Sequence, residues 1–514
     1  MGLAQSLCCS SQWGKEEYQM PRPVTPFERY LSPYEAVPTK HALGKVVHAA
    51  FITDTEEPLA NHYKLGKKAL GVGGFSTVTT ARCKTTGDVR AIKMISKARM
   101  GDTGKENVLQ EIEIMKTLNH PYIIKLQETF EDEGNIYLVM ELCTGGDLSD
   151  RILEVQYFTE TQAAHLMMQI FNGIFYCHQV GVCHRDIKPE NCVFHNKDPI
   201  EQSTLKIIDF GISSTFTPGQ TFKATARTSY YVAPEVLSGR CNQACDMWSC
   251  GVVMYVMLSG DHPFSGDIHS ETLEKVQRAN LAFDLDACKG ISEDAKHLMR
   301  MCLQNDPEVR YTAGQAVEDV WIKDKDLRCR YTPSTSGLVN NLHGFQSQPM
   351  FPKATLHIDA NHLKEKQIEA LRDTFMTVDA NGDGVLTSAE FAQGLKTAGF
   401  NEMPVDFHKI MDGVDSNGNG VIDYTEFLAA TEMLTVFMQE SVCWSAFRVF
   451  DRNGDGTISR EELMAIIGDE YVSNVINHTA ETIDELMKEV DVNGNGNIDF
   501  KEFMQMMRAS AEAR

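Results

Sequence analysis

Two short stretches in the middle of the chain hold residues suited to phosphoryl transfer. "HRDIKPEN", residues 184–191, contains Asp186, Lys188 and Asn191. Asp186 can accept the proton of a substrate hydroxyl, Lys188 can balance charge on the transferred group, and Asn191 can bind a metal ion. Further on, "DFG" supplies Asp209 as an oxygen ligand for Mg²⁺. These residue types predict an enzyme that moves phosphate.

A glycine-rich stretch, "LGVGGFSTV", precedes both and contains Gly71, Gly73 and Gly74. Glycine lets backbone amides approach phosphate oxygens because no Cβ is in the way. Taken alone, the pattern fits an ordinary hairpin turn equally well. Lys93 in "RAIK" and Glu111 on a predicted helix favour the phosphate interpretation, since such a pair orients the α and β phosphates of a nucleotide.

The elements that must hold these residues follow from the periodicity of the chain. Alternating apolar residues predict paired strands over 63–82 and 88–96, and a helical repeat follows in "NVLQEIEIMKTL". Residues 161–322 are mostly helical in pattern. Residues 1–62 lack sustained periodicity, which predicts a flexible leader. A Pro, Ser and Gly cluster in "RYTPSTSGLVNNLHGF" marks a junction, and amphipathic helices separated by Asp, Asn and Gly loops follow it.

A twelve-residue loop occurs four times in the last part of the chain. Its first aspartate stands at 379, 415, 451 and 491, so the steps are 36, 36 and 40 residues. Oxygen-bearing side chains at positions 1, 3 and 5, a glycine at 6 and a glutamate at 12 suit Ca²⁺. The expected ligands, with position 7 binding through its backbone carbonyl, are Asp379, Asn381, Asp383, Val385, Glu390, Asp415, Asn417, Asn419, Val421, Glu426, Asp451, Asn453, Asp455, Thr457, Glu462, Asp491, Asn493, Asn495, Asn497 and Glu502.

The apolar residue at position 8 of each loop predicts how the loops pair. Leu386 should lie beside Ile422, and Ile458 beside Ile498, so that four loops form two lobes. Two loops carry asparagine at position 5, and fewer carboxylates weaken Ca²⁺ binding. Mg²⁺ occupancy at rest is therefore an alternative for these two sites.

From Tyr63 to Ile322 the chain resembles the eukaryotic protein kinases, because the glycine loop, lysine, glutamate, catalytic loop and DFG occur in that family's order. The resemblance implies a small strand-rich lobe over a helical lobe, with Mg²⁺ and ATP between them, and Arg310 paired with Glu235. The residues that it places at the nucleotide, the metal and the substrate are Gly71, Val72, Gly73, Gly74, Phe75, Val78, Ala91, Lys93, Met140, Glu141, Cys143, Asp147, Glu190, Asn191 and Asp209.

The activation segment departs from the family pattern. Where relatives place an acidic or phosphorylatable residue to meet Arg185, this chain has Ala224, with Thr225 next to it. Either Thr225 is phosphorylated instead or no loop phosphate is required, and we favour the second. Asp147 and Glu190 match positions that receive basic residues in basophilic kinases. We therefore expect substrates with Arg or Lys about three residues before the Ser or Thr.

Over nearly its whole length the chain is similar to the calcium-dependent protein kinases of plants and protists. This similarity implies an α+β bilobal kinase domain (63–322), an autoinhibitory junction (323–362) and an all-α calmodulin-like domain of two lobes (363–514). It implies a serine/threonine kinase that the junction holds inactive until Ca²⁺ binds. The alternatives are a membrane-tethered calcium sensor or scaffold, or a constitutively active kinase whose calcium sites serve localisation.

The N-terminus and the composition suggest where the protein works. "MGLAQSLCCSS" fits N-myristoylation at Gly2, with Cys8 or Cys9 as palmitoylation sites that would make anchoring stable. We expect the protein at the cytoplasmic face of a membrane, with some of it in the cytosol.

The formal net charge of -23 and the pI of about 5.1 argue against a nucleic-acid partner. We also expect a monomer.

The 14 cysteines have no zinc-ribbon or zinc-knuckle spacing, which indicates reduced thiols. Cys241, Cys245 and Cys250 lie close together in sequence. We attribute this group to simple burial.

Overall fold

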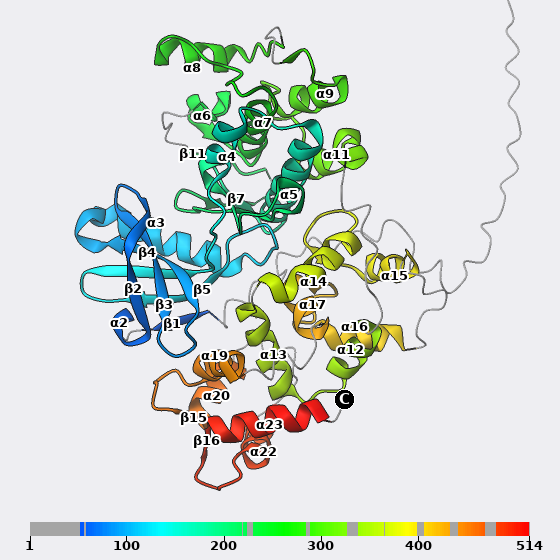
Figure 1. Ribbon diagram of the computed structural model, residues 1–514. Helices are drawn as coiled ribbons and strands as arrows, with labels where there is room; N and C mark the ends of the chain where they lie inside the picture. The colour runs from blue at the N-terminus through cyan, green and yellow to red at the C-terminus, as the bar shows by residue number, and fades with distance from the viewer. Residues whose placement is uncertain are drawn as a thin grey trace, which may run out of the picture.

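The computed structural model contains two lobes in the kinase region, followed by a helical region that lies against both of them (Figure 1). The described residues are 52–55, 58–217, 219–223, 230–283, 288–325, 338–363, 365–397, 406–431, 440–467 and 480–512. The expected α+β bilobal domain and the all-α region after it are both present.

A six-stranded sheet forms the N-terminal lobe, with strand order β1-β5-β6-β4-β3-β2. The strands from β2 onward pair antiparallel, which places Lys93 on β4 opposite Val78 on β3 and Leu138 on β6. The long helix α3 lies beside the sheet and carries Glu111. The elements of this lobe are α2 (Leu59–His62), β2 (Tyr63–Val72), β3 (Ser76–Cys83), β4 (Val89–Ser96), α3 (Lys97–Thr117), β5 (Leu126–Glu131) and β6 (Asn135–Met140).

A short strand that precedes the predicted kinase domain joins its N-terminal sheet. β1 (Thr53–Thr55) pairs in parallel with β5, and the Asp54 carboxylate lies 2.7 Å from Lys116 Nζ on α3. Thr53–Thr55 and Leu59–His62, which the sequence predicts in the flexible leader, are therefore part of the folded lobe. Three residues are too few to show the alternation of a strand, so only the contacts with β5 and α3 reveal it.

The C-terminal lobe is built around the buried helix α7, whose residues Trp248 and Tyr255 are almost completely shielded from solvent. Short strands and turns connect the helices and carry the catalytic loop. The elements are α4 (Leu148–Val155), α5 (Glu160–Gln179), β7 (Val182–Cys183), η2 (Pro189–Asn191), β8 (Cys192–Phe194), η3 (Ile200–Gln202), β9 (Leu205–Ile207), β10 (Ser214–Thr215), β11 (Phe222–Lys223), α6 (Pro234–Leu237), β12 (Arg240–Cys241), α7 (Ala244–Ser259), α8 (His269–Arg278), α9 (Glu293–Cys302), α10 (Ala313–Val317) and α11 (Val320–Lys325).

The calcium loops pair as the sequence predicts. Leu386 lies opposite Ile422 in the ladder of β13 and β14, and Ile458 lies opposite Ile498 in that of β15 and β16. Each ladder joins two helix-loop-helix units into one lobe. The elements are α14 (Glu365–Val378), β13 (Val385–Leu386), α15 (Ser388–Thr397), α16 (Phe407–Val414), β14 (Ile422–Asp423), α17 (Tyr424–Thr431), α19 (Glu440–Phe450), β15 (Thr457–Ser459), α20 (Arg460–Ile467), α22 (Ala480–Val490), β16 (Asn497–Asp499) and α23 (Phe500–Glu512).

Two helices of the predicted junction pack against these lobes. α12 (Leu338–Gln346) contacts α16 and α17 of the first lobe. α13 (Met350–His362) contacts α17 of the first lobe and α19 and α23 of the second. The junction helices therefore lie within the calmodulin-like region, and α13 bridges its two lobes.

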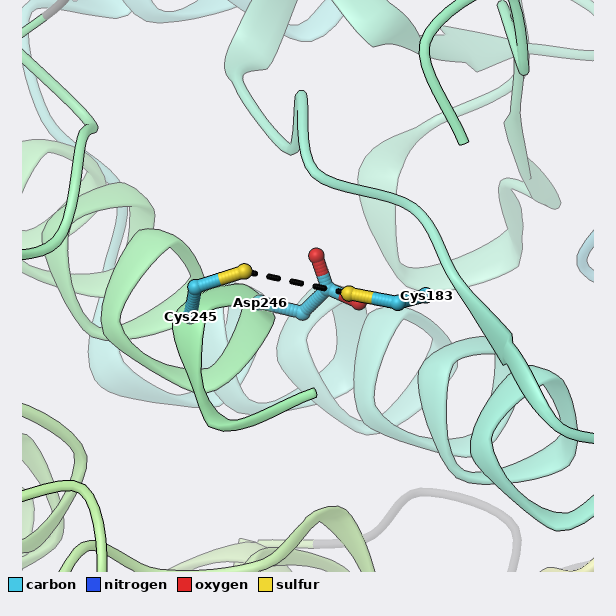
Figure 2. A group of neighbouring side chains, drawn as sticks. All are labelled: Cys183, Cys245 and Asp246. Atoms are coloured by element: carbon cyan, nitrogen blue, oxygen red, sulfur yellow. Dashed lines mark hydrogen bonds between the residues drawn. The ribbon is translucent and has the colours of Figure 1, made fainter. Parts of the chain in front are cut away.

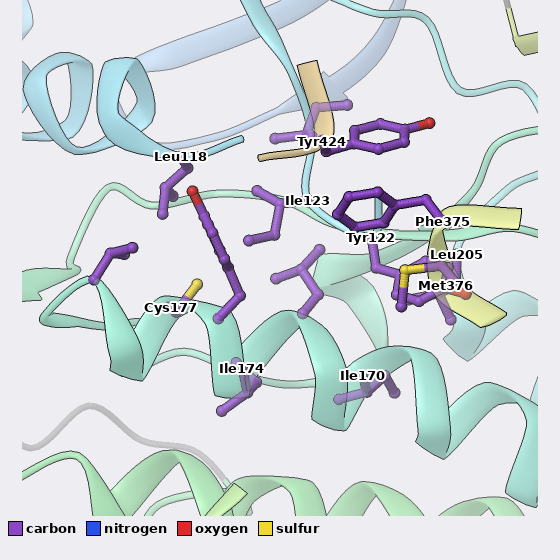
Figure 3. Close-up of a cluster of buried hydrophobic side chains, with 14 of the residues drawn as sticks. Leu118, Tyr122, Ile123, Ile170, Ile174, Cys177, Leu205, Phe375, Met376 and Tyr424 are labelled. Atoms are coloured by element: carbon purple, nitrogen blue, oxygen red, sulfur yellow. The ribbon is translucent and has the colours of Figure 1, made fainter. Parts of the chain in front are cut away.

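The first calcium lobe lies directly on the kinase. Phe375, Met376 and Tyr424 from α14 and α17 face Tyr122 and the side chains of α5 (Figure 3). The approach is close enough that a Cβ on Gly382, in the first calcium loop, would lie 2.4 Å from Asn172 Oδ1. The kinase and the calcium lobe thus share one continuous apolar core.

Candidate functional site

The glycine-rich stretch forms the turn between β2 and β3. Gly71 pairs with Val78, and the Gly73 N–H donates to the Ser76 carbonyl at 2.8 Å. The Phe75 side chain at the tip is exposed, as is that of Val72. Gly71 and Gly74 have open space where a Cβ would be, so a ligand can approach the backbone between these exposed side chains, which suits a loop that covers phosphates.

Lys93 lies between two carboxylates, as its expected role requires. Its Nζ is 2.6 Å from Glu111 Oε1 and 3.0 Å from Asp209 Oδ1. Burial alone would lower the pKa of Lys93, but the charges of Glu111 and Asp209 outweigh it and raise that pKa. Burial likewise opposes ionisation of Asp209, yet Lys93 keeps its pKa below the usual value. The amine is thus charged and oriented for phosphate, and the Asp209 carboxylate for a cation.

The predicted base Asp186 is held by its neighbours in the catalytic loop. Its Oδ2 accepts hydrogen bonds from Lys188 Nζ at 2.6 Å and from Asn191 Nδ2 at 3.0 Å. Asn191 Nδ2 also donates to the Asp186 backbone carbonyl at 2.8 Å. This arrangement fixes the carboxylate while leaving Oδ1 for a substrate hydroxyl, and it leaves the Asn191 oxygen for Mg²⁺.

A buried carboxylate on α7 supports the catalytic loop from below. Asp246 accepts hydrogen bonds from the His184 N–H at 2.9 Å and the Arg185 N–H at 2.7 Å. Its Oδ2 also lies 2.9 Å from His178 Nε2. Because Asp246 is fully buried, these bonds tie the position of the catalytic loop to the first turn of α7.

A buried ion pair joins the end of the activation segment to the helical lobe. Arg310 makes two hydrogen bonds to Glu235, at 2.6 and 2.9 Å, and its side chain is fully buried. The expected structural ion pair is confirmed. Such a bidentate pair fixes geometry as well as charge.

The predicted hinge lies at the end of β6, where Met140 pairs with Ala91 of β4. The Glu141 carboxylate turns away from β4, since it lies 3.1 Å from Lys206 Nζ and accepts the Lys125 N–H at 2.9 Å. Only backbone groups of Glu141 are therefore left for adenine. Burial raises the pKa of the Cys143 thiol, so this cysteine stays protonated.

Asp147 and Glu190, the expected acidic pair, occupy neighbouring elements. Asp147 is the N-cap of α4 and accepts the Asp150 N–H at 2.8 Å, while Glu190 lies on η2 and is exposed. The pKa of Asp147 is raised by partial burial and, to a smaller extent, by the charges of Asp150 and Glu190. The pair forms an acidic surface suited to a basic peptide.

The four calcium loops share one backbone conformation. The glycine at position 6 has a positive φ in every loop: Gly384 (82°), Gly420 (87°), Gly456 (87°) and Gly496 (85°). The position-1 aspartate accepts N–H groups from inside its loop, as Asp491 does from Gly494 and Gly496 at 2.7 Å. These bonds fold each loop around a common centre.

Charge in the first two loops points to a cation. Burial and the nearby Glu390 raise the pKa of Asp383 to about 7. Burial and the nearby Asp423 raise the pKa of Glu426 well above its usual value. Carboxylates this crowded resist ionisation unless a cation joins them. The oxygen-rich ligand set fits Ca²⁺, which when bound supplies the missing positive charge.

Comparison with known proteins agrees with this geometry. The protein kinase domain family matches residues 64–322, and the EF-hand domain pair matches residues 368–432 and 440–508. The chain is 38% identical over 472 residues to calcium-dependent protein kinase 5 of Plasmodium falciparum (isolate 3D7), covering 91% of this chain and 82% of the relative. The chain belongs to the calcium-dependent protein kinases.

A plant relative agrees with this assignment. The kinase is 36% identical over 454 residues to calcium-dependent protein kinase 17 of Arabidopsis thaliana, covering 88% of this chain and 84% of that protein. It is therefore a calcium-activated serine/threonine kinase that uses ATP and Mg²⁺ and binds Ca²⁺ through its EF-hands. Mg·ATP supplies the phosphoryl group when bound, and Asp186, Lys93 and Asp209 orient the reacting groups around it.

Several predicted positions lie outside the described residues, namely Gly2, Cys8 and Cys9 of the leader and Ala224 and Thr225 of the activation segment. Arg185, however, is described, and its Nη1 donates to Ser214 Oγ at 2.7 Å while its guanidinium lies 5.1 Å from the Phe222 ring. That no loop phosphate is required stays a prediction. None of the helices in the described part of the chain has the length and apolar character that a membrane span needs.

Asn119 of the kinase contacts the second calcium loop, and sequence reasoning missed it. Asn119 Nδ2 donates to Asp423 Oδ1 at 3.2 Å, and Asn119 Oδ1 accepts from Thr425 Oγ1 at 2.9 Å. Asp423 is position 9 of its loop. The contact joins residues more than 300 positions apart, and nothing in the stretch "LNHPYI" signals a partner.

Proposed function

We propose that residues 323–362 keep the kinase inactive at rest, and that Ca²⁺-loaded EF-hands restore activity by holding the junction. The observation that carries this proposal is the position of α13, which bridges the two calcium lobes. Phe351 is almost fully buried and contacts the rings of Phe450 and Phe503, with centroids 4.9 and 5.8 Å away. Holding the helix between the two lobes would keep it away from the active-site cleft.

The second calcium loop contacts both the junction and the kinase, so Ca²⁺ binding to this loop can affect both. His357 Nε2 on α13 lies 2.7 Å from the Ser416 hydroxyl, at position 2 of that loop. Asp423, at position 9, bonds to Asn119 of the kinase. When the loop closes around Ca²⁺, both partners are engaged by one rigid unit. Calcium then favours the released state because that state binds it more tightly.

Removing the residues beyond Lys325 tests the inhibitory role of the junction. The cut leaves α11 intact, where Lys325 Nζ lies 3.5 Å from Glu160. Calcium-free activity should rise about tenfold or more relative to intact kinase in EGTA, since a coupling of at least about 1.4 kcal/mol is lost. If the truncated kinase is no more active than the intact one without Ca²⁺, the junction does not inhibit.

A buried aspartate on α13 should raise the Ca²⁺ concentration that half-maximal activation requires. Asp359 is fully buried in α13, and its carboxylate oxygens have no hydrogen-bond partner within the described part of the chain. A buried polar group without a partner costs about 1–3 kcal/mol. Asp359→Leu should therefore strengthen the docking of α13 and lower the half-maximal Ca²⁺ concentration by about two- to tenfold. A higher half-maximal Ca²⁺ concentration in this variant would contradict the proposal.

The same residue predicts a pH dependence. Burial raises the pKa of docked Asp359 far above its usual value, so docking takes up a proton at neutral pH. Docking is therefore favoured at low pH and weakens as the pH rises. Between pH 6 and 8 the wild-type kinase should need increasingly more Ca²⁺ than Asp359→Asn does. Comparison with this variant removes the titration of the calcium ligands, which both proteins share.

We also propose that myristate on Gly2, with palmitate on Cys8 or Cys9, anchors the kinase to the cytoplasmic face of a membrane. The motif "MGLAQSLCCSS" supports this. Gly2→Ala should move most of the kinase to the soluble fraction of cells, because a single acyl chain already binds only marginally. Cys8→Ser with Cys9→Ser should give an intermediate distribution. A Gly2→Ala protein that stays on membranes would refute the anchor.

The acidic surface of Asp147 and Glu190 supports a preference for substrates with Arg or Lys before the target Ser or Thr. We further propose that the kinase acts as a monomer, since its calcium lobes contact its own kinase domain. Turnover of basic and acidic peptides, and light scattering with Ca²⁺, would check these two points. Equal turnover of an acidic-flanked peptide would contradict the preference, and a stable dimer would contradict the monomer.

A further inference from the structure

Three cysteines meet beneath the catalytic loop. Cys183 ends β7 directly before His184, Cys241 ends β12, and Cys245 lies in the first turn of α7. Cys241 Sγ is 2.9 Å from Cys245 Sγ, and Cys245 Sγ is 3.7 Å from Cys183 Sγ. Figure 2 shows Cys183 and Cys245 side by side next to Asp246. All three thiols are free and buried.

A bound metal ion is one explanation for this group, because Cys183, Cys245 and Asp246 offer ligand atoms within 4.8 Å of one another. The carboxylate argues against it. Both Asp246 oxygens already accept hydrogen bonds from His184, Arg185 and His178, and a metal would have to break them. The close approach of Cys241 and Cys245 instead favours chemistry between two sulfurs.

We propose that Cys241 and Cys245 form a reversible disulfide in the presence of a peroxide, and that this bond lowers kinase activity by displacing Asp246. The sulfurs are already 2.9 Å apart and need to move to about 2.05 Å. The move pulls the first turn of α7 toward β12. Asp246 follows Cys245 in that turn, so its bonds to the catalytic loop are the first to be strained.

Cys241 is the sulfur that attacks. Hydrogen bonding with the neighbouring thiols of Cys183 and Cys245 lowers the pKa of Cys241 below the usual value of a thiol, which favours the nucleophilic thiolate. Cys241 S⁻ attacks one peroxide oxygen, the O–O bond breaks, and hydroxide leaves, giving a sulfenic acid. Cys245 then attacks that sulfur, the S–O bond breaks, and water leaves as the disulfide forms. In total, two thiols and H₂O₂ give one disulfide and two waters.

Access to Cys241 is controlled by the activation segment. Cys241 is only 1% exposed, and in the two-residue ladder of β11 and β12 it pairs with Phe222. The Arg185 guanidinium lies over the same Phe222 ring. Because a two-residue ladder opens locally at little cost, peroxide reaches the sulfur when β11 separates from β12.

The experiment uses intact, reduced kinase with Ca²⁺, treated with hydrogen peroxide, quenched with catalase and then alkylated. One tryptic peptide, residues 241–275, contains Cys241, Cys245 and Cys250. After treatment this peptide should lose two hydrogens and take up alkylating agent only at Cys250. Activity should fall at least about fivefold and return with dithiothreitol.

Matched variants decide whether the disulfide causes the loss of activity. Cys241→Ser and Cys245→Ser should retain activity after peroxide, whereas Cys250→Ser, on the same helix and in the same peptide, should lose it as wild type does. The proposal is overturned if all three cysteines of treated wild-type protein still react, or if Cys241→Ser is inactivated like wild type. It is also overturned if purified protein holds one Zn²⁺ per chain that protects the thiols. Peptide mapping of wild type decides the matter even if a variant fails to fold.

Discussion

Replacing Asp186 with asparagine should reduce kcat about 10²- to 10⁴-fold, which is the usual contribution of a positioned general base. Asparagine can still accept hydrogen bonds from Lys188 and Asn191, which now bond to Asp186 Oδ2, so the loop should keep its shape. It cannot take the proton of the substrate hydroxyl. Steady-state phosphorylation of a basic peptide at saturating Ca²⁺ measures the effect.

The KM for ATP separates lost chemistry from lost structure. It should change little, because Lys93, Glu111 and Asp209 remain in place. Asp198→Asn is the matched control, because Asp198 is exposed on the same lobe and its replacement by asparagine removes the same charge. An Asp186→Asn kinase that keeps kcat within about threefold of wild type would show that another group takes the proton.

Replacing Glu426 with glutamine should raise the half-maximal Ca²⁺ concentration for activation about tenfold or more, because the bidentate charged ligand at position 12 is lost. Glu426 is buried and accepts the Ser416 and Asp423 N–H groups at 2.9 Å. Glutamine can preserve one of these bonds but not the charge. Peptide phosphorylation across a free-Ca²⁺ titration measures the shift.

The effect should reach activity because Ser416 and Asp423 contact the junction and the kinase. Asp412→Asn provides the control. Asp412 lies on the exposed side of α16, just before the loop, and its loss changes the net charge equally without removing a ligand. If both variants shift the titration by the same amount, general electrostatics rather than ligation sets the calcium requirement.

The pairing of Lys93 with Glu111 and the pairing of the calcium loops could be predicted because each depends on a local motif. Lys93 and Glu111 were expected to pair and do so at 2.6 Å. Leu386 and Ile422 were expected to meet and lie opposite each other. In both cases the chemistry requires fixed residue types at fixed spacing, so a short stretch of sequence carries the information.

The contacts that join the two halves could not be predicted in this way. Asn119 meets the second calcium loop, and β1 joins the sheet, only because distant segments pack together. In the sequence Asp359 looks like an ordinary surface residue, and only the packing of α13 between the two lobes shows that it is buried. The contacts through which we propose that Ca²⁺ acts are therefore tertiary contacts, which neither periodicity nor motif spacing records.

The most direct test is phosphate transfer from Mg·ATP to a basic Ser/Thr peptide by intact kinase, first in EGTA and then across a free-Ca²⁺ titration. We expect little activity in EGTA and a steep rise as Ca²⁺ reaches roughly micromolar concentrations, the range of sensor EF-hands. Equal activity in both conditions would show that the contacts between the EF-hands, the junction and the kinase have no regulatory effect.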